Sequence, residues 1–62
     1  MDSYLSHFYY KIVNKLTGKT ICVSDCYSYD ETEFYKNHPG TFRNEYQIIS
    51  REEYDEIKNR GL

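Results

Sequence analysis

The sequence lacks most of the short motifs that reveal a biochemical activity. It contains no GxxxxGK[ST] phosphate-binding loop, no GxGxxG dinucleotide motif, no HExxH zinc-protease motif and no EF-hand loop. No stretch approaches the roughly 18 apolar residues of a membrane span. The first residues also lack the basic start and apolar run of a signal peptide. These absences argue against the common nucleotide, zinc-protease and calcium functions and predict a cytoplasmic protein.

Cysteine is also scarce. Cys22 and Cys26 are the only two cysteines, too few to staple a small secreted protein with disulfides. With the isolated His7 and His38 they could supply four zinc ligands, but structural zinc sites usually present two close ligand pairs. We therefore expect two reduced thiols, no metal and no cofactor.

The chain is short, with 62 residues, so it forms one domain at most. A domain of this size buries only about 60% of the surface its unfolded chain exposes. It has no room for a deep cleft with a supporting shell of side chains, which an enzyme site usually needs. Cys26, His38 and Asp25 could make a nucleophilic set, but no motif fixes their geometry. We expect a single domain over residues 1–62, with residues 1–6 loose, and no catalytic residues.

Aromatic side chains compensate for a low content of aliphatic ones. Mean hydropathy is -0.88 and hydrophobic residues make up 39% of the chain, values that by themselves suggest disorder. Eight tyrosines and three phenylalanines, however, bring the aromatic content to 18%, and each ring can bury a large area. The composition therefore indicates a folded chain.

Alternating polarity predicts a hairpin at the start of the domain. Residues 7–15 and 20–24 have strand composition, and Gly18 lies in the turn between them. On the first strand, Phe8, Tyr10 and Ile12 share one face, which we expect to be core. The other face, with Tyr9, Lys11, Val13 and Lys15, is expected to be half-exposed.

Capping signals predict two helices after the hairpin. Residues 24–29 are rich in turn-forming side chains, and Asp30 with Glu33, or Ser28 with Glu31, fits a capping box. A short helix should follow to about residue 37, anchored by Phe34. A third strand is expected over residues 45–49, and a second helix capped by Ser50 should follow it.

The predicted order is β-β-α-β-α. It indicates an α+β fold in which two short helices pack on one face of a three-stranded, mainly antiparallel sheet. The expected core residues are aromatic: Phe8, Tyr10, Phe34, Tyr46 and Tyr54.

Charge and tyrosine together predict a protein-binding surface. The first 24 residues carry three lysines and one acid, whereas residues 25–62 carry nine acids and five bases. The remaining tyrosines cannot all be buried in so small a chain, and exposed tyrosine is favoured at interface hot spots. Acids at helix starts also favour the helix dipole, so they need not bind anything. If they do bind, they would meet a basic groove on a partner protein, through Tyr27, Tyr29, Asp30, Glu31, Glu33, Tyr35, Glu52, Asp55 and Glu56.

A second hypothesis is nucleic-acid binding by the hairpin. Tyr9 with Lys11, Lys15 and Lys19 offers a stacking ring and three cations. The alternative is an exposed strand face on which lysines prevent edge pairing. The acidic half of the chain would repel phosphate, so binding to a protein is the leading hypothesis.

At the level of a class, the chain resembles the small proteins encoded by bacteriophages. The resemblance rests on compactness and on two segments, residues 10–19 (YKIVNKLTGK) and residues 46–54 (YQIISREEY). Such proteins often inhibit a host or defence enzyme by direct binding, as anti-CRISPR and anti-restriction proteins do. The resemblance implies an inhibitor in the host cytoplasm, and it assigns a role to no particular residue.

Overall fold

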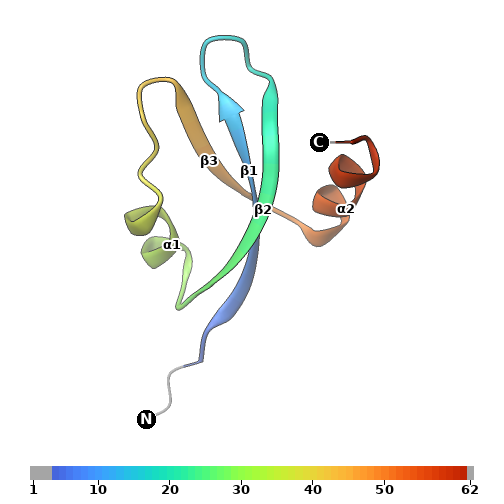
Figure 1. Ribbon diagram of the computed structural model, residues 1–62. Coiled ribbons are helices and arrows are strands. Elements are labelled where there is room, and N and C mark those ends of the chain that lie inside the picture. The colour runs from blue at the N-terminus through green and yellow to red at the C-terminus, as the bar shows by residue number, and fades with distance from the viewer. Residues whose placement is uncertain (1–3, 62) are drawn as a thin grey trace.

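The computed structural model describes residues 4–61, and the chain forms one open sheet flanked by two helices (Figure 1). The predicted α+β class and the order β-β-α-β-α are confirmed. The elements are β1 (Ser6–Asn14), β2 (Thr20–Ser28), α1 (Glu31–Asn37), β3 (Asn44–Ile49) and α2 (Arg51–Asn59).

Strand β1 lies in the middle of the sheet, with strand order β2-β1-β3 and antiparallel pairing on both sides. The pairing with β2 shifts by one residue between Ile12 and Val13, because Cys22 faces Ile12 and Thr20 faces Val13. Ile21 is thus the extra residue of a β-bulge, a feature that bends a strand and increases its twist. The predicted turn at Gly18 is confirmed, with φ of 75°.

Strand β2 is longer than the sequence predicted. Residues 25–28, beyond the predicted strand 20–24, were expected to belong to a connection, but they pair with the first half of β1, from Asp25 opposite Tyr9 to Ser28 opposite Ser6. The nine residues of β1 give this segment a template, and the pairing overrides its turn-like composition. Ser6 begins β1, so the expected loose leader is wrong at this residue, and residues 1–3 of that leader lie outside the described part of the chain.

Both helices begin at the predicted caps. The Asp30 carboxylate accepts a hydrogen bond from the Glu33 backbone N–H at 2.8 Å. The Ser50 hydroxyl accepts one from the Glu53 N–H at 3.1 Å. Each bond satisfies one of the amide donors that have no partner inside a helix. At the end of α1, His38 Nδ1 lies 2.9 Å from the Phe34 carbonyl oxygen, so the imidazole caps this helix end.

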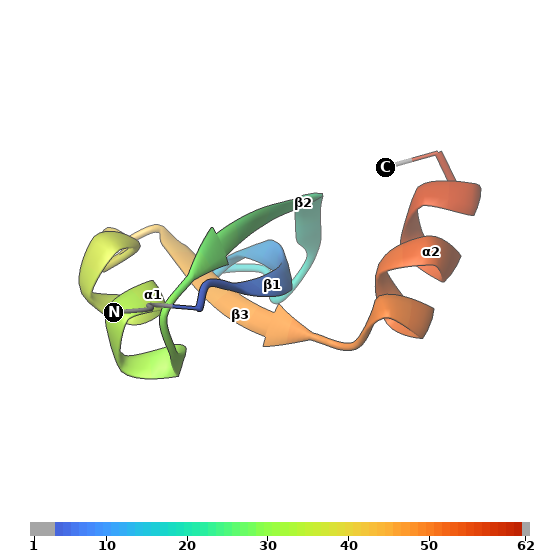
Figure 2. The same cartoon turned by 90° about the horizontal axis from the view of Figure 1, so that it is seen from below.

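The two helices lie on opposite faces of the sheet, which corrects the prediction that both pack on one face (Figure 2). Phe34 of α1 contacts the rings of Phe8 and Tyr10, with centroid distances of 5.9 and 5.1 Å. Tyr54 of α2 contacts the ring of Tyr9, at 4.8 Å. Because successive residues of a strand point to opposite faces, these contacts define a Tyr10 face under α1 and a Lys11 face under α2. Both faces carry apolar side chains, so each one needs a cover.

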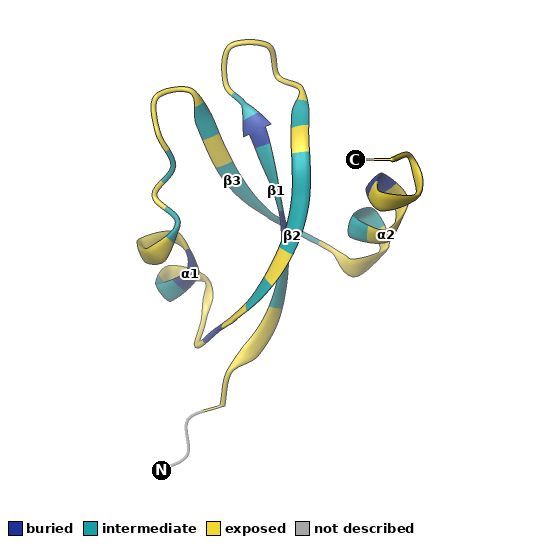
Figure 3. Cartoon of the chain, in the orientation of Figure 1, coloured by how far each residue is buried: buried dark blue, intermediate teal, exposed yellow. Residues whose placement is uncertain are grey.

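The core is small and divided between the two faces (Figure 3). Phe34 is fully buried, and Tyr10 is buried beside it. Val13 and Ile57 are buried on the other side, because α2 covers the face that was expected to be half-exposed. The other predicted core residues are only half-buried: Phe8, Tyr46 and Tyr54.

Candidate partner-binding surface

The structure divides the predicted acidic, tyrosine-rich surface into two parts. One part follows the end of β2 into the start of α1. The other lies on α2, which packs on the face of the sheet opposite to α1 (Figure 2).

The first part is the acidic aromatic corner, which we define as Tyr27, Tyr29, Asp30 and Glu31. The two tyrosines are 64% and 57% exposed, and the two acids are also exposed. The Asp30 carboxylate already holds the Glu33 N–H, so the backbone at the corner is fixed by the helix cap. The corner presents two aromatic rings and two negative charges on a segment that joins two regular elements.

Two residues that the sequence analysis did not assign to the binding surface, His7 and Asp25, extend this corner along the Lys11 face. The imidazole of His7 stacks on the Tyr27 ring, with centroids 4.6 Å apart and planes tilted by 8°. Its Nε2 lies 2.6 Å from an Asp25 carboxylate oxygen. His7 faces Tyr27 across the β1–β2 pair, where side chains on one face of a sheet come together. The signal for this contact was the strand register, which becomes apparent only once residues 25–28 are recognised as strand.

Two other predicted binding residues are occupied within the fold. The Tyr35 hydroxyl accepts a hydrogen bond from the Ile48 N–H at 3.1 Å, so this ring ties α1 to β3. Glu33 accepts a hydrogen bond from the Asn37 side chain at 3.2 Å. Although 43% of Tyr35 remains exposed, its hydroxyl already accepts the hydrogen bond from the Ile48 N–H within the fold.

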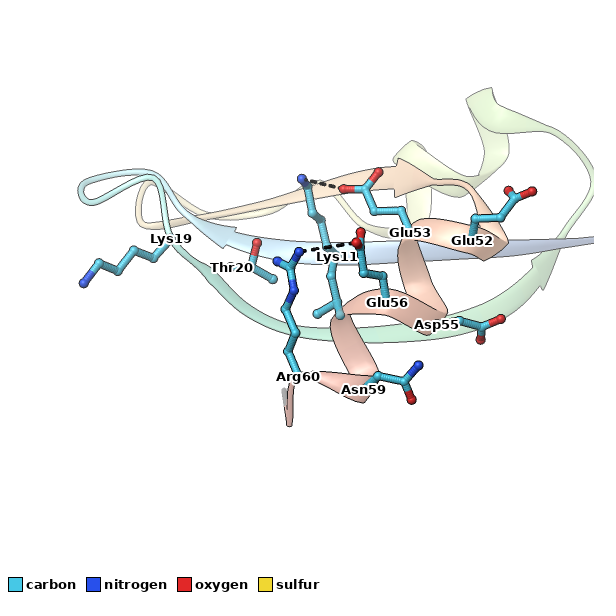
Figure 4. Close-up of a pocket in the computed structure, with 10 residues that line it drawn as sticks. Lys11, Lys19, Thr20, Glu52, Glu53, Asp55, Glu56, Asn59 and Arg60 are labelled. Carbon is cyan, nitrogen blue, oxygen red and sulfur yellow. Dashed lines mark hydrogen bonds and ion pairs between the residues drawn. The ribbon is translucent and has the colours of Figure 1, made fainter.

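The acids of α2 border a different feature, an open hollow of about 980 Å³ between this helix and the hairpin (Figure 4). Arg60 forms an ion pair with Glu56 at 3.4 Å, and Arg51 forms one with Asp55 at 3.8 Å. Basic side chains on the helix thus offset two of the three predicted acids, and among these three only Glu52 has no ion pair within residues 4–61. The α2 surface is therefore mixed in charge rather than acidic.

The predicted nucleic-acid face is also divided. Tyr9 lies under Tyr54, and the Lys11 ammonium forms an ion pair with Glu53 at 3.1 Å. Lys15 and Lys19 remain exposed near the turn of the hairpin. Helix α2 thus engages the stacking ring and one of the three cations, and only two lysines of this face remain exposed.

The cysteine and histidine side chains do not converge. Cys22 and Cys26 pair with Ile12 and Phe8 and so lie on the Tyr10 face, whereas His7 stacks with Tyr27 on the Lys11 face. Across residues 4–61, no three side chains of histidine, cysteine, aspartate or glutamate form a metal-ligand group. Burial raises the pKa of the Cys26 thiol, and the neighbouring Asp25 carboxylate raises it further. This thiol therefore stays protonated to higher pH than a free cysteine does.

Neither helix in the described chain is long and apolar enough to cross a bilayer. Comparisons with protein-family models, with curated proteins and with solved structures found no match.

Proposed function

We propose that this chain is a non-enzymatic protein-binding domain, an inhibitor or adaptor, that docks on a basic surface of a partner protein through the acidic aromatic corner. The observation that carries the proposal is the juxtaposition of two largely exposed tyrosines with two exposed acids at one helix start. Exposed tyrosine supplies contact area at a low cost in side-chain entropy, and adjacent carboxylates steer a cationic partner.

The local structure supports this choice over the α2 surface. The corner is held on both sides, by the pairing of Ser28 with Ser6 in the sheet and by the burial of Phe34 in the core. A surface that is fixed before binding loses less entropy when it docks. The resemblance to bacteriophage inhibitors suggests the partner class, which would be a host or defence enzyme.

The test compares variants that separate contact area from charge. Tyr29→Ala should accelerate dissociation from the partner about 5- to 150-fold, the equivalent of roughly 1–3 kcal/mol for a hot spot. Glu31→Gln should act on association instead, and its effect should shrink as salt screens the charge. The measurement is surface plasmon resonance at several salt concentrations, with a partner first captured from host lysate and identified by mass spectrometry.

Two matched variants serve as controls. Tyr4 is 82% exposed but lies outside the corner, and Glu52 is an exposed acid on α2. Tyr4→Ala and Glu52→Gln should both bind at parental rates. If Tyr29→Ala and Glu31→Gln, both folded by circular dichroism, bind as the parent does, the corner is not the docking surface.

A further inference from the structure

The direction of the backbone hydrogen bonds indicates which edge of the sheet is open. The Asn14 N–H donates to the Lys19 carbonyl at 2.8 Å, and the Asn14 carbonyl accepts from the Gly18 N–H at 2.7 Å. The next residue, Lys15, donates in the opposite direction, to the Arg43 carbonyl at 2.7 Å. Even-numbered residues of β1 therefore bond toward β2, and odd-numbered residues bond toward β3.

The same alternation holds along β2. Cys22, Ser24 and Cys26 face the even-numbered residues of β1, so their backbone groups are used inside the sheet. The N–H and C=O groups of Val23, Asp25 and Tyr27 consequently point away from β1. Within residues 4–61 these outward groups have no hydrogen-bond partner on the backbone or on a side chain. Figure 2 shows β2 at the margin of the sheet, with no described segment beyond it.

The other edge of the sheet is covered at Asn44 and Ile48, whereas the outward backbone groups of Tyr46 have no partner within residues 4–61. On β3, the outward N–H of Ile48 donates to the Tyr35 hydroxyl. The N–H of Asn44 donates to the Thr41 hydroxyl at 3.0 Å, and the Asn44 carbonyl accepts from the Thr41 N–H at 2.9 Å. Edge strands are usually blunted by such contacts, by lysine, by proline or by a β-bulge. Strand β2 has neither lysine nor proline in its nine residues, and Asp25 is its one charged residue. Its bulge at Ile21 lies near one end and leaves Cys22–Ser28 regularly paired.

We propose that two copies of this chain associate through the outer edges of their β2 strands, which pair antiparallel to form one continuous sheet of six strands. A two-fold axis perpendicular to the sheet would pass close to Ser24, the central residue of β2. In this register Val23 exchanges backbone hydrogen bonds with Asp25 of the second copy, and Ile21 lies opposite Tyr27. The self-pairing does not depend on the partner-binding proposal.

Length and charge favour this register over its neighbours. Counted over Thr20–Ser28, the axis at Ser24 gives the longest overlap, with the bulge at Ile21 interrupting regular pairing only at its two ends. Centring on Asp25 would also place two carboxylates directly opposite each other, which destabilises a strand pair. The Ser24 register instead puts each carboxylate opposite a valine and brings two exposed apolar side chains together, because Ile21 is 45% and Tyr27 is 64% exposed.

Both helices contact β2, but within residues 4–61 neither forms backbone hydrogen bonds with its outer edge. Tyr35 ties α1 to β3, at the far edge of the sheet. Helix α2 lies over the Lys11 face rather than over the edge itself (Figure 2).

The register makes a chemical prediction about the cysteines. Cys22 of one copy would face Cys26 of the other, on the same face, at a pair of residues that exchange no hydrogen bonds. Such pairs have Cα atoms about 4.5 Å apart, within the roughly 4.4–6.8 Å range of disulfides. Within one copy the two cysteines are four residues apart on an extended strand, about 13 Å, which is too far for a disulfide. Any disulfide formed by the folded chain must therefore join two copies.

The first experiment measures mass and edge protection on the full chain. Sedimentation velocity from low micromolar to millimolar concentration should show the mass doubling from 7.5 kDa. Over the same range, hydrogen exchange at the amides of Val23, Asp25 and Tyr27 should slow. Val23→Pro removes one outward N–H without touching the bonds to β1, and it should keep the chain monomeric. Val23→Ala retains that N–H and should still dimerise.

The second experiment determines the register of the strand pair, and it does not depend on whether the proline variant folds. Diamide is added to the reduced protein, and it takes up the two electrons and two protons that each new disulfide releases. Because the Cys26 thiol holds its proton, the reaction is followed over hours at mildly alkaline pH. Peptide mapping should find Cys22 joined to Cys26, and both Cys22→Ser and Cys26→Ser should lose the covalent dimer.

Three outcomes would overturn the proposal. A chain that stays monomeric to millimolar concentration has no self-pairing edge. A covalent dimer that persists in one of the single-cysteine variants has a different register. If the three outward amides become protected only when a partner protein is added, the edge belongs to that partner.

Discussion

Phe34 is the residue on which the Tyr10 face depends. Its side chain is fully buried and contacts Phe8, Tyr10 and His38, and the His38 imidazole stacks on it at 4.4 Å. His38 also caps the end of α1 through the Phe34 carbonyl. One phenylalanine therefore links a helix, its terminal cap and the central strand.

Replacement of Phe34 by alanine should lower the free energy of unfolding by about 3 kcal/mol or more, because it leaves a cavity in a core with few other buried side chains. Urea denaturation followed by circular dichroism measures the change. Phe42→Ala is the matched control, since Phe42 is 78% exposed and its loss should change stability by about 0.5 kcal/mol at most. Equal stability of the two variants would mean that α1 is not docked through Phe34.

At the scale of the elements, the connections are as constrained as the helices and strands. The loop between α1 and β3 contains Gly40, with φ of 77°, close to the start of β3. A Cβ atom at Gly40 would lie 2.7 Å from the Asn44 carbonyl oxygen, a backbone atom that already accepts a bond from Thr41. Gly18, in the hairpin turn, has nearly the same φ, 75°, but no atom within 4 Å of such a Cβ.

These two glycines separate the cost of backbone conformation from the cost of a clash. Gly18→Ala should destabilise the domain by roughly 1–2 kcal/mol, the usual penalty for a side chain in the left-handed region. Gly40→Ala should cost more, because the start of β3 must also shift. Thermal and urea melts of both variants measure the difference. A Gly40→Ala protein as stable as Gly18→Ala would show that the loop moves freely.

At the scale of the whole molecule, the two helices pack on opposite faces of the sheet. The sheet is therefore the centre of the fold, and its edges are the parts that the helices do not cover. The acidic aromatic corner follows β2, and the open edge belongs to the same strand. Partner binding and self-pairing would therefore both use Tyr27, so self-pairing would cover part of each corner.

The arrangement of the whole molecule also predicts that folding needs no metal. The two cysteines lie on one face of the sheet and His7 lies on the other, and no three candidate ligand side chains of residues 4–61 come together in a metal-ligand group. Thermal melts with and without a strong chelator should superimpose. A lower midpoint in the chelator, restored by added zinc, would contradict this prediction.

The local sequence could predict much of the fold. Asp30 and Ser50 start the helices as expected, and Gly18 lies in the hairpin turn. These features depend on capping and turn preferences, which act over three or four residues and can be recognised without the rest of the chain. Exposure of Tyr27 and Tyr29 likewise followed from the limited interior of a small domain.

Contacts between distant residues were decided only by the tertiary structure. Ser24–Ser28 has turn-forming composition, yet it forms strand because β1 is long enough to pair with it, and that pairing brings His7 onto Tyr27. Predicting that α2 packs on the Lys11 face would have required knowing that both faces of the sheet carry apolar side chains that need a cover. The amino-acid sequence by itself determined the elements and their order. Cross-strand register and the packing of the helices determined which side chains meet, because those interactions join residues far apart in the chain and depend on the whole sheet being formed.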